Sequence, residues 1–151
     1  MSLHFPDAVE HWPIDRLRLY ERNARTHSDG QVAQIAASMI EFGWTVPILA
    51  DGQGNVIAGH GRLAAASQLG LDTVPVVVLD HLTEAQRRAY IIADNKLALN
   101  AGWDEELLAA ELQALADEEI DLSLLGFDQD EVDRLLDGLD SGNRSNLDCL
   151  R

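Results

Sequence analysis

Residues 55–70 constrain the fold of this chain more than any other stretch, because they predict a strand that runs through glycines into a helix. Val56-Ile57-Ala58 has the apolar residues of a short buried strand, and Gly59-His60-Gly61 is a turn that bulkier residues could not make as tightly. We expect the helix to begin at Arg62 and to end at Leu69. The inward face of this helix is predicted to consist of Leu63, Ala66 and Leu69. Gly70 is predicted to end the helix.

The start of such a helix favours an anion, most often a phosphate, because free backbone N–H groups converge there. Glycines on both sides of His60 would let the backbone approach that phosphate closely, and Arg62 would add a fork of donors. A tight turn with a solvated arginine explains the same residues, and the stretch alone does not decide between the two interpretations. His60 itself is a candidate general base, phosphate donor or hydrogen-bonded turn residue.

The segments before this stretch predict an edge strand, a helix and a hairpin. His11-Trp12-Pro13-Ile14 is expected at an edge, where proline is tolerated. Ser28 and Gln31 have capping-box spacing, and Gly43 ends the helix that they open. Residues 44–50 lead into a strand, and residues 51–54 form a hairpin turn into the next one. The predicted helical face consists of Val32, Ile35, Ala36 and Met39.

After residue 70 the pattern predicts one more strand and a long helix. Residues 73–79 are almost continuously apolar, which indicates burial on both faces. Thr83 and Gln86 form a second capping box, and the helix runs to about Leu99. The face expected in the core consists of Ala85, Ala89, Ile92 and Ala93. A different stripe carries Arg87, Arg88, Ile91, Asp94 and Asn95.

The last third of the chain predicts short helices. Asp104 is expected to cap a helix to about Ala116, and Asp128 with Glu131 opens another that ends at Leu136. The inward residues of the first helix are predicted to be Leu107, Leu108, Leu112 and Leu115. The fold class is therefore α/β, or α+β, with a small mixed sheet and packed helices. We expect a flexible arm over residues 1–10 and a main domain over residues 11–100. A helical extension is expected over residues 101–138, and a disordered tail or truncated linker over residues 139–151.

Charge and composition limit the partners. The chain has 26 acidic and 11 basic residues, a formal net charge of −15, so we expect little direct binding to duplex DNA. The basic cluster around residues 16–25 is either an anion contact or a solvated loop. Cys149 is the single cysteine, which argues against disulfides and cysteine metal sites. No apolar run approaches the ~20 residues of a membrane span, and a cytoplasmic location is predicted.

Asp94 and Asn95 place a carboxylate beside an amide carbonyl near the end of the long helix. These oxygen ligands suit Mg²⁺ held together with phosphates. A polar helix end is the alternative interpretation of the same pair.

Several of these segments together resemble the ParB/sulfiredoxin superfamily. Residues 59–62, Gly-His-Gly-Arg before an alanine-rich helix, look like its Gly-x-x-Arg phosphate box. Residues 43–48 are similar to its first nucleotide box, and Asp94-Asn95 resembles the Glu-Asn pair of its third box. Asn23-Ala24-Arg25 stands where the family has a loop with Asn and Arg. The resemblance covers about residues 12–100 and is greatest to the ParB-like domains at the N-terminus of phage-type DNA methyltransferases.

The resemblance implies a ParB-like domain that binds a nucleoside triphosphate, ATP or CTP, with Mg²⁺. It implies NTPase or nuclease activity, with His60 as the candidate catalytic residue, and Asp94 and Asn95 as metal ligands. The implied nucleotide contacts are Gly59, His60, Gly61, Arg62, Thr45, Pro47, Asn23 and Arg25. The implied partners are a DNA methyltransferase domain, DNA reached indirectly, and a second copy of the chain in a homodimer.

The chain also departs from the family pattern. Sulfiredoxins carry Cys where His60 stands, and ParB partition proteins usually show Gly-Glu-Arg-Arg in the box. We expect no helix-turn-helix module of ParB length after residue 100, and hence no centromere binding. Trp44 and Trp103 are expected to pack in the core or a lid rather than to stack on bases.

Two other functions remain alternatives. The first is a non-catalytic interaction module that positions a DNA methyltransferase. The second is a Rossmann-type NAD-binding protein, since Gly59-x-Gly61-x-x-Ala64 fits the dinucleotide fingerprint and Asp80 lies where the ribose acid would. A preceding hairpin strand, a short βαβ unit and the lack of a second half weigh against the dinucleotide fold.

Overall fold

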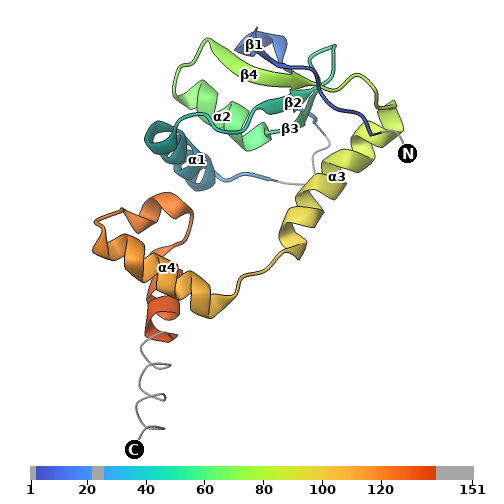
Figure 1. Ribbon diagram of the computed structural model, residues 1–151. Helices are drawn as coiled ribbons and strands as arrows, with labels where there is room; N and C mark the ends of the chain where they lie inside the picture. The colour runs from blue at the N-terminus through green and yellow to red at the C-terminus, as the bar shows by residue number, and fades with distance from the viewer. Residues whose placement is uncertain (1–2, 22–25, 139–151) are drawn as a thin grey trace, which may run out of the picture. The chain divides into compact units, whose positions relative to one another are not determined.

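The computed structural model describes residues 3–21 and 26–138 of the chain (Figure 1). Its contacts divide the chain into two compact units, Met1–Asn100 and Ala101–Arg151, called here the N-terminal and C-terminal units. No helix of the described residues is long and apolar enough to cross a membrane.

The N-terminal unit is built on a four-stranded sheet with the order β1-β4-β2-β3. The strands are β1 (Val9–Pro13), β2 (Ile48–Ala50), β3 (Val56–Ala58) and β4 (Thr73–Val78). β4 pairs antiparallel with β1 and parallel with β2, and β2 pairs antiparallel with β3. The predicted small mixed sheet is confirmed, and β1 lies at an edge as Pro13 required.

One face of the sheet carries most of the core. Figure 1 shows α1 (Asp29–Phe42) and α2 (His60–Gln68) on the same side of the sheet. Val74 and Val76 of β4 are fully buried, while Pro75 and Val77 between them are only half-buried. β4 is therefore less enclosed than its apolar run predicted. The buried residues of this core are Trp12, Leu17, Ile48, Ala50, Val56, Leu63, Ala66, Val74 and Val76.

The predicted ends of α1 and of α3 (Glu84–Asn100) are confirmed. Ser28 Oγ accepts the N–H of Gln31 at 3.1 Å, and Gly43, with φ of 83°, donates its N–H to the last turn of α1. At the start of α3 both bonds of the capping box form. Thr83 N–H donates to the Gln86 side chain at 3.0 Å, and Gln86 N–H donates to Thr83 Oγ1 at 3.1 Å.

The start of α2 differs from the prediction by two residues. Gly59 in the left-handed conformation, with φ of 100°, is the N-cap, and its carbonyl accepts the N–H of Leu63 at 2.9 Å. The helix therefore begins at His60, and Arg62 lies within its first turn. Leu69 is exposed rather than inward, because α2 instead buries Gly61 and Ala65 on a second face. Gly70 ends the helix as predicted, in a Schellman arrangement.

The predicted core face of α3 was wrong. Ala85, Ala89, Ile92 and Ala93 are all exposed. Ile91 is the buried residue of this helix, and Arg87 and Asn95, one turn away on either side, are half-buried. Arg87, Ile91 and Asn95 of the other predicted stripe therefore face the domain, because long polar side chains can bury their stems beside a single apolar anchor. Arg88 and Asp94 of the same stripe are exposed.

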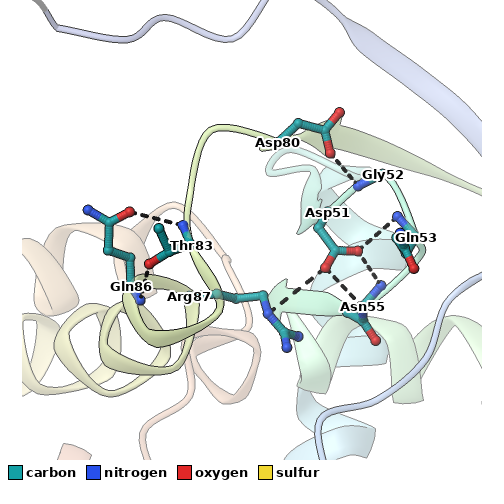
Figure 2. A network of polar contacts seen from close by, with 8 residues as sticks. All are labelled: Asp51, Gly52, Gln53, Asn55, Asp80, Thr83, Gln86 and Arg87. Carbon is teal, nitrogen blue, oxygen red and sulfur yellow. Dashed lines mark hydrogen bonds and ion pairs between the residues drawn. The ribbon is translucent and has the colours of Figure 1, made fainter.

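A polar network ties the start of α3 to the β2–β3 hairpin (Figure 2). The Asp51 carboxylate accepts the N–H groups of Gln53 and Asn55 at 3.0 and 2.9 Å, and pairs with Arg87 Nε at 3.9 Å. Asp80 Oδ1, after β4, accepts the N–H of Gly52 at 2.6 Å. The half-buried Asp51 carboxylate thus links the hairpin turn to α3, and the exposed Asp80 carboxylate links the same turn to the end of β4.

The C-terminal unit contains α4 (Glu105–Asp117), the 3-10 turn η2 (Leu122–Leu125) and a helix over residues 129–138. Asp104 Oδ1 caps α4 through the N–H of Leu107, and Asp128 with Glu131 forms the predicted capping box. The buried centre consists of Ala109, Leu112 and Leu135. Leu107, predicted to face inward, is instead exposed, because α4 turns the Ala109 and Leu112 face to this centre. The predicted tail, residues 139–151 with Cys149, lies outside the described residues.

Candidate functional site

The start of α2 offers backbone donors without a side-chain cap. An α-helix leaves its first N–H groups without an intrahelical partner. At Gly59 no side chain of the described residues supplies a capping hydrogen bond, and glycine has none to give. The N–H groups at the start of α2 and the positive end of the helix dipole therefore favour a negatively charged group.

Gly59 and Gly61 are each required in this turn for a different structural reason. Gly59 needs its left-handed backbone, and a Cβ there would lie 3.1 Å from Ile48 Cγ1. A Cβ on Gly61 would lie 2.8 Å from Ile35 Cδ1 and 3.1 Å from His27 Cε1, both on or beside α1. The absent side chain of Gly61 thus lets α1 pack closely. This packing role of Gly61 was not part of the sequence analysis.

His60 holds a polar atom that lacks a partner. Its Nε2 is buried and makes no hydrogen bond within the described residues. Burial, and to a lesser extent the nearby His27, lowers the pKa of His60 below its ordinary value of 6.5. In a neutral imidazole this nitrogen donates or accepts one hydrogen bond according to the tautomer, and as Nε2–H it can donate to an acceptor oxygen.

His27 is a neighbour that the sequence analysis did not place at this site. It lies just before the N-cap of α1, and its Nδ1 is 2.8 Å from Gln31 Oε1. The packing of α1 on α2 brings it against Gly61. The sequence did contain a signal for this helix packing, namely the small residues Gly61 and Ala65, four apart on α2. Such pairs allow two helices to approach each other closely.

Arg62 is half-buried in the first turn of α2. This turn contains no acidic residue, and no carboxylate of the described residues lies within ion-pair distance of the Arg62 guanidinium. A cation here opposes the helix dipole, which favours acids at this end. Its charge is therefore uncompensated within the part of the chain that the structure describes.

The first nucleotide box lies next to this turn in space. Ile48, the first residue of β2, contacts Gly59, so the preceding segment with Thr45 and Pro47 leads directly to the start of α2. Thr45 is exposed and Pro47 half-buried. Trp44 packs against the core and donates its Nε1–H to the Val46 carbonyl at 2.7 Å, so its expected packing role is confirmed.

The candidate metal ligands lie on α3, which packs against β3, the strand leading into Gly59. Asn95 donates Nδ2–H to the Ile91 carbonyl at 2.7 Å, which leaves its side-chain oxygen available. Asp94 is exposed and accepts the Tyr90 hydroxyl at 3.3 Å. Burial and then the Asp94 charge raise the pKa of Tyr90. Residues 3–21 and 26–138 contain no group of three or more His, Cys, Asp or Glu that could hold a metal.

The remaining predicted residues fall elsewhere. Asn23 and Arg25 lie outside the described residues. Asp80, the proposed ribose acid, instead binds the backbone of the β2–β3 turn. β3 is an antiparallel edge strand, whereas a dinucleotide fold needs a parallel strand inside the sheet at this point. The Rossmann alternative was therefore wrong.

The fold and the turn define a class of protein, a small α+β domain. In it an edge strand leads through a glycine into a helix whose start has no side-chain cap. The sequence profile of the ParB N-terminal domain matches residues 6–95. The chain therefore belongs to the ParB N-terminal domain family.

A second profile, that of the ParB-methyltransferase HTH domain, matches residues 106–148. The sequence analysis expected no helix-turn-helix module of ParB length after residue 100, and it did not foresee this other kind of helix-turn-helix module. The name of this second profile agrees with the resemblance to methyltransferase-linked ParB-like domains that the sequence analysis noted.

One protein relative agrees with this assignment, and two solved structures share the fold. The "ParB-like nuclease domain-containing protein YnaK" of Escherichia coli K12 is 53% identical over 76 residues, which cover 50% of this chain and 87% of that protein. The crystal structure of the C-terminally truncated chromosome-partitioning protein ParB from Caulobacter crescentus complexed with CTP-gamma-S is similar, with a TM-score of 0.66 and 23% identity over 83% of this chain and 75% of that one. A Pnob8-like ParB-N domain gives a TM-score of 0.50 at 22% identity, over 74% of this chain and 45% of that one.

Proposed function

We propose that the N-terminal unit binds a nucleoside triphosphate with its phosphates at the start of α2. The observation that supports this most is that one helical turn carries three unsatisfied groups. They are the uncapped N–H groups after Gly59, the buried Nε2 of His60 and the unpaired guanidinium of Arg62. Each favours an anion with oxygen acceptors, and a phosphate chain supplies several acceptors at once.

Arg62 supplies the full positive charge that the partial charges of the helix end lack. Its planar guanidinium can donate two parallel hydrogen bonds to phosphate oxygens, and the backbone N–H groups can donate to the phosphate chain as well. As Nε2–H, His60 donates to a phosphate oxygen the hydrogen bond that this nitrogen does not make within the described residues. Thr45 and Pro47 border the same turn through Ile48, and Asn23 and Arg25 complete the proposed nucleotide contacts.

The donor set on α3 fits Mg²⁺ only as part of a shared site. Mg²⁺ is commonly held by one or two carboxylates together with substrate phosphates and water, rather than by a cage of protein ligands alone. Asp94 offers a carboxylate, and Asn95 offers a side-chain oxygen that it does not use elsewhere in the described residues. When bound, Mg²⁺ would neutralise part of the phosphate charge. Asp94→Ala should therefore remove the gain in affinity that Mg²⁺ gives and leave the fold intact.

CTP and ATP are the first nucleotides to test. The Caulobacter ParB structure was determined with CTP-gamma-S, which makes CTP the leading candidate for this chain as well. Any hydrolysis would rest on His60, whose lowered pKa keeps the ring neutral near pH 7 and able to accept a proton. Nuclease activity is a candidate because the name of YnaK includes it.

Thermal unfolding of the chain with CTP, ATP, GTP and NAD, each with and without Mg²⁺, tests the proposal. We expect stabilisation by a triphosphate, increased by Mg²⁺, and none by NAD. Calorimetry then compares Arg62→Ala with Arg88→Ala, a matched loss of one exposed arginine on α3. Arg62→Ala should weaken binding by ~1.5–3 kcal/mol, the scale of a charge-assisted hydrogen bond, and should not lower the stability of the free protein. Arg88→Ala should change neither quantity.

If Arg62→Ala destabilises the free protein and binds nucleotide normally, the arginine is structural and the proposal fails. A second candidate function is a non-catalytic module that positions a DNA methyltransferase. The match of residues 106–148 to a ParB-methyltransferase HTH domain favours it. The same nucleotide screen separates the two, since this module needs no nucleotide and predicts no stabilisation by any of them.

A further inference from the structure

The C-terminal unit exposes an apolar patch that its own core leaves open. Trp103 and Leu107 keep 68% and 66% of their surface exposed, and Phe127 packs against Trp103 with ring centroids 5.8 Å apart. α4 directs its opposite face, with Ala109 and Leu112, into the centre of the unit. We call Trp103, Leu107 and Phe127 the Trp103 patch. Phe127 is half-buried and also packs against the centre of the unit, so the exposed apolar side chains of the patch are Trp103 and Leu107. An exposed tryptophan is typical of interface centres.

Acidic residues surround this patch along the chain. Asp104, Glu105 and Glu106 follow Trp103, and Asp128 and Asp130 follow Phe127. Asp104 and Asp128 are fixed by their capping bonds at the first turns of the two helices. The remaining carboxylates are exposed and free to face a partner of opposite charge.

The charge of this unit opposes contact with DNA. Residues 106–148, which match the helix-turn-helix profile, contain thirteen acidic residues and two arginines. Helix-turn-helix domains approach DNA with Lys and Arg that neutralise phosphates, and this term supplies most of their non-specific affinity. With so few cations, this unit would instead be repelled by a phosphate backbone.

We propose that the Trp103 patch docks a protein segment that carries Lys and Arg around an apolar anchor, such as a basic amphipathic helix. The anchor inserts beside the Trp103 and Phe127 rings, and the basic side chains pair with the surrounding carboxylates. The charge complementarity speeds association and selects against acidic partners, while the aromatic contact supplies most of the affinity. This inference does not depend on nucleotide binding by the N-terminal unit.

The test uses the full chain and a fluorescently labelled synthetic amphipathic peptide of Lys and Leu, with fluorescence anisotropy as the measurement. The first control is a peptide of the same composition with the leucines dispersed. Trp103→Ala and Leu107→Ala are compared with Leu99→Ala, an equally exposed leucine of the N-terminal unit. Circular dichroism confirms that each variant keeps its helix content, which we expect because all three side chains are exposed.

We expect the amphipathic peptide to bind at least tenfold more tightly than the dispersed one. Trp103→Ala should weaken binding at least tenfold, Leu107→Ala less, and Leu99→Ala less than twofold. Equal binding of both peptides, or no binding of either, would overturn the proposal, as would an unchanged affinity of both patch variants. Sub-micromolar binding of duplex DNA that Trp103→Ala abolishes would also overturn it, because the patch would then contact nucleic acid.

Discussion

The two units of this chain differ most in how they carry charge. Residues 1–100 contain eleven acidic and eight basic residues, whereas residues 101–151 contain fifteen acidic and three basic ones. The strong negative charge of the whole chain therefore belongs mainly to the C-terminal unit. Arg62 and the basic cluster at residues 16–25 both lie in the other unit. A very acidic chain can thus still gather most of its basic residues in one unit, so net charge limits partners unit by unit.

The units also differ in their packing. The N-terminal unit buries an apolar core between a sheet and helices, with Ile48, Val56 and Val76 fully enclosed. The C-terminal unit has a small all-helical centre of Ala109, Leu112 and Leu135, and leaves Trp103 exposed. One unit thus has a core between a sheet and helices and the other a small helical centre, while both leave large apolar side chains exposed, such as Ile40 and Trp103.

The largest expected effects on stability come from substitutions that test whether the two cores unfold independently. Ile48→Ala in the N-terminal unit and Leu112→Ala in the C-terminal unit each remove a fully buried side chain and should cost about 2–5 kcal/mol. Hydrogen exchange should show that each variant loses protection mainly in its own unit, because the contacts divide there. If Leu112→Ala removes protection throughout residues 3–100, the two units unfold together and the comparison fails.

A smaller effect is expected from the aspartates that fix turns in the two units. Asp51→Ala removes three hydrogen bonds and the ion pair with Arg87, and should destabilise the N-terminal unit by about 1–3 kcal/mol. Asp121→Ala, which removes bonds to Ser123 from a fully exposed carboxylate, should have a smaller effect. Urea unfolding measures both, and an equal loss in the two variants would contradict the difference in burial.

The Asp51 carboxylate also predicts that the stability of the N-terminal unit depends on pH. Burial acts to raise the pKa of Asp51, but hydrogen bonds from Asn55 and Gln53 and the charge of Arg87 together lower it below 3.8. Its contribution to stability should be fully present above pH 3.8 and lost as the pH falls through the lowered pKa. In Asp51→Ala this part of the acid destabilisation should be absent.

The smallest expected effect concerns His60. Its pKa in the folded protein lies below 6.5, so between these two values the unfolded chain binds more protons than the folded one. Stability of the N-terminal unit should therefore be full above pH 6.5 and decline as the pH falls from there towards the lowered pKa. His60→Gln should flatten this slope. The C-terminal unit has no histidine and serves as the internal reference, so an identical slope in both units would assign the effect to other groups.

Local signals in the sequence predicted the ends of most elements. Ser28, Thr83, Asp104 and Asp128 each cap the helix expected of them, because a cap depends on residues three apart. The glycine turn and the hairpin before it were predicted for the same reason. The start of α2 was placed two residues late, since the left-handed Gly59 N-cap cannot be recognised from residue types alone.

Features that depend on packing between distant elements could not be predicted in this way. Arg87 and Asn95 face the domain because Ile91 is the single anchor of α3, although Ile92 looked equally apolar. His27 reaches the start of α2 only because α1 packs on Gly61. Trp103 was expected in a core or lid and is exposed, because the C-terminal unit closes its centre without it.

The central claim is that the phosphates of a nucleotide lie at the start of α2. Two-dimensional ¹H–¹⁵N NMR of the full chain, titrated with CTP and with ATP in the presence of Mg²⁺, tests it residue by residue. The account predicts that with at least one of them the largest shifts occur at the backbone amides of Gly59, His60, Gly61 and Arg62, and that residues 101–138 stay unchanged. Saturable shifts that fall in the C-terminal unit, or that leave these four amides in place, would contradict it.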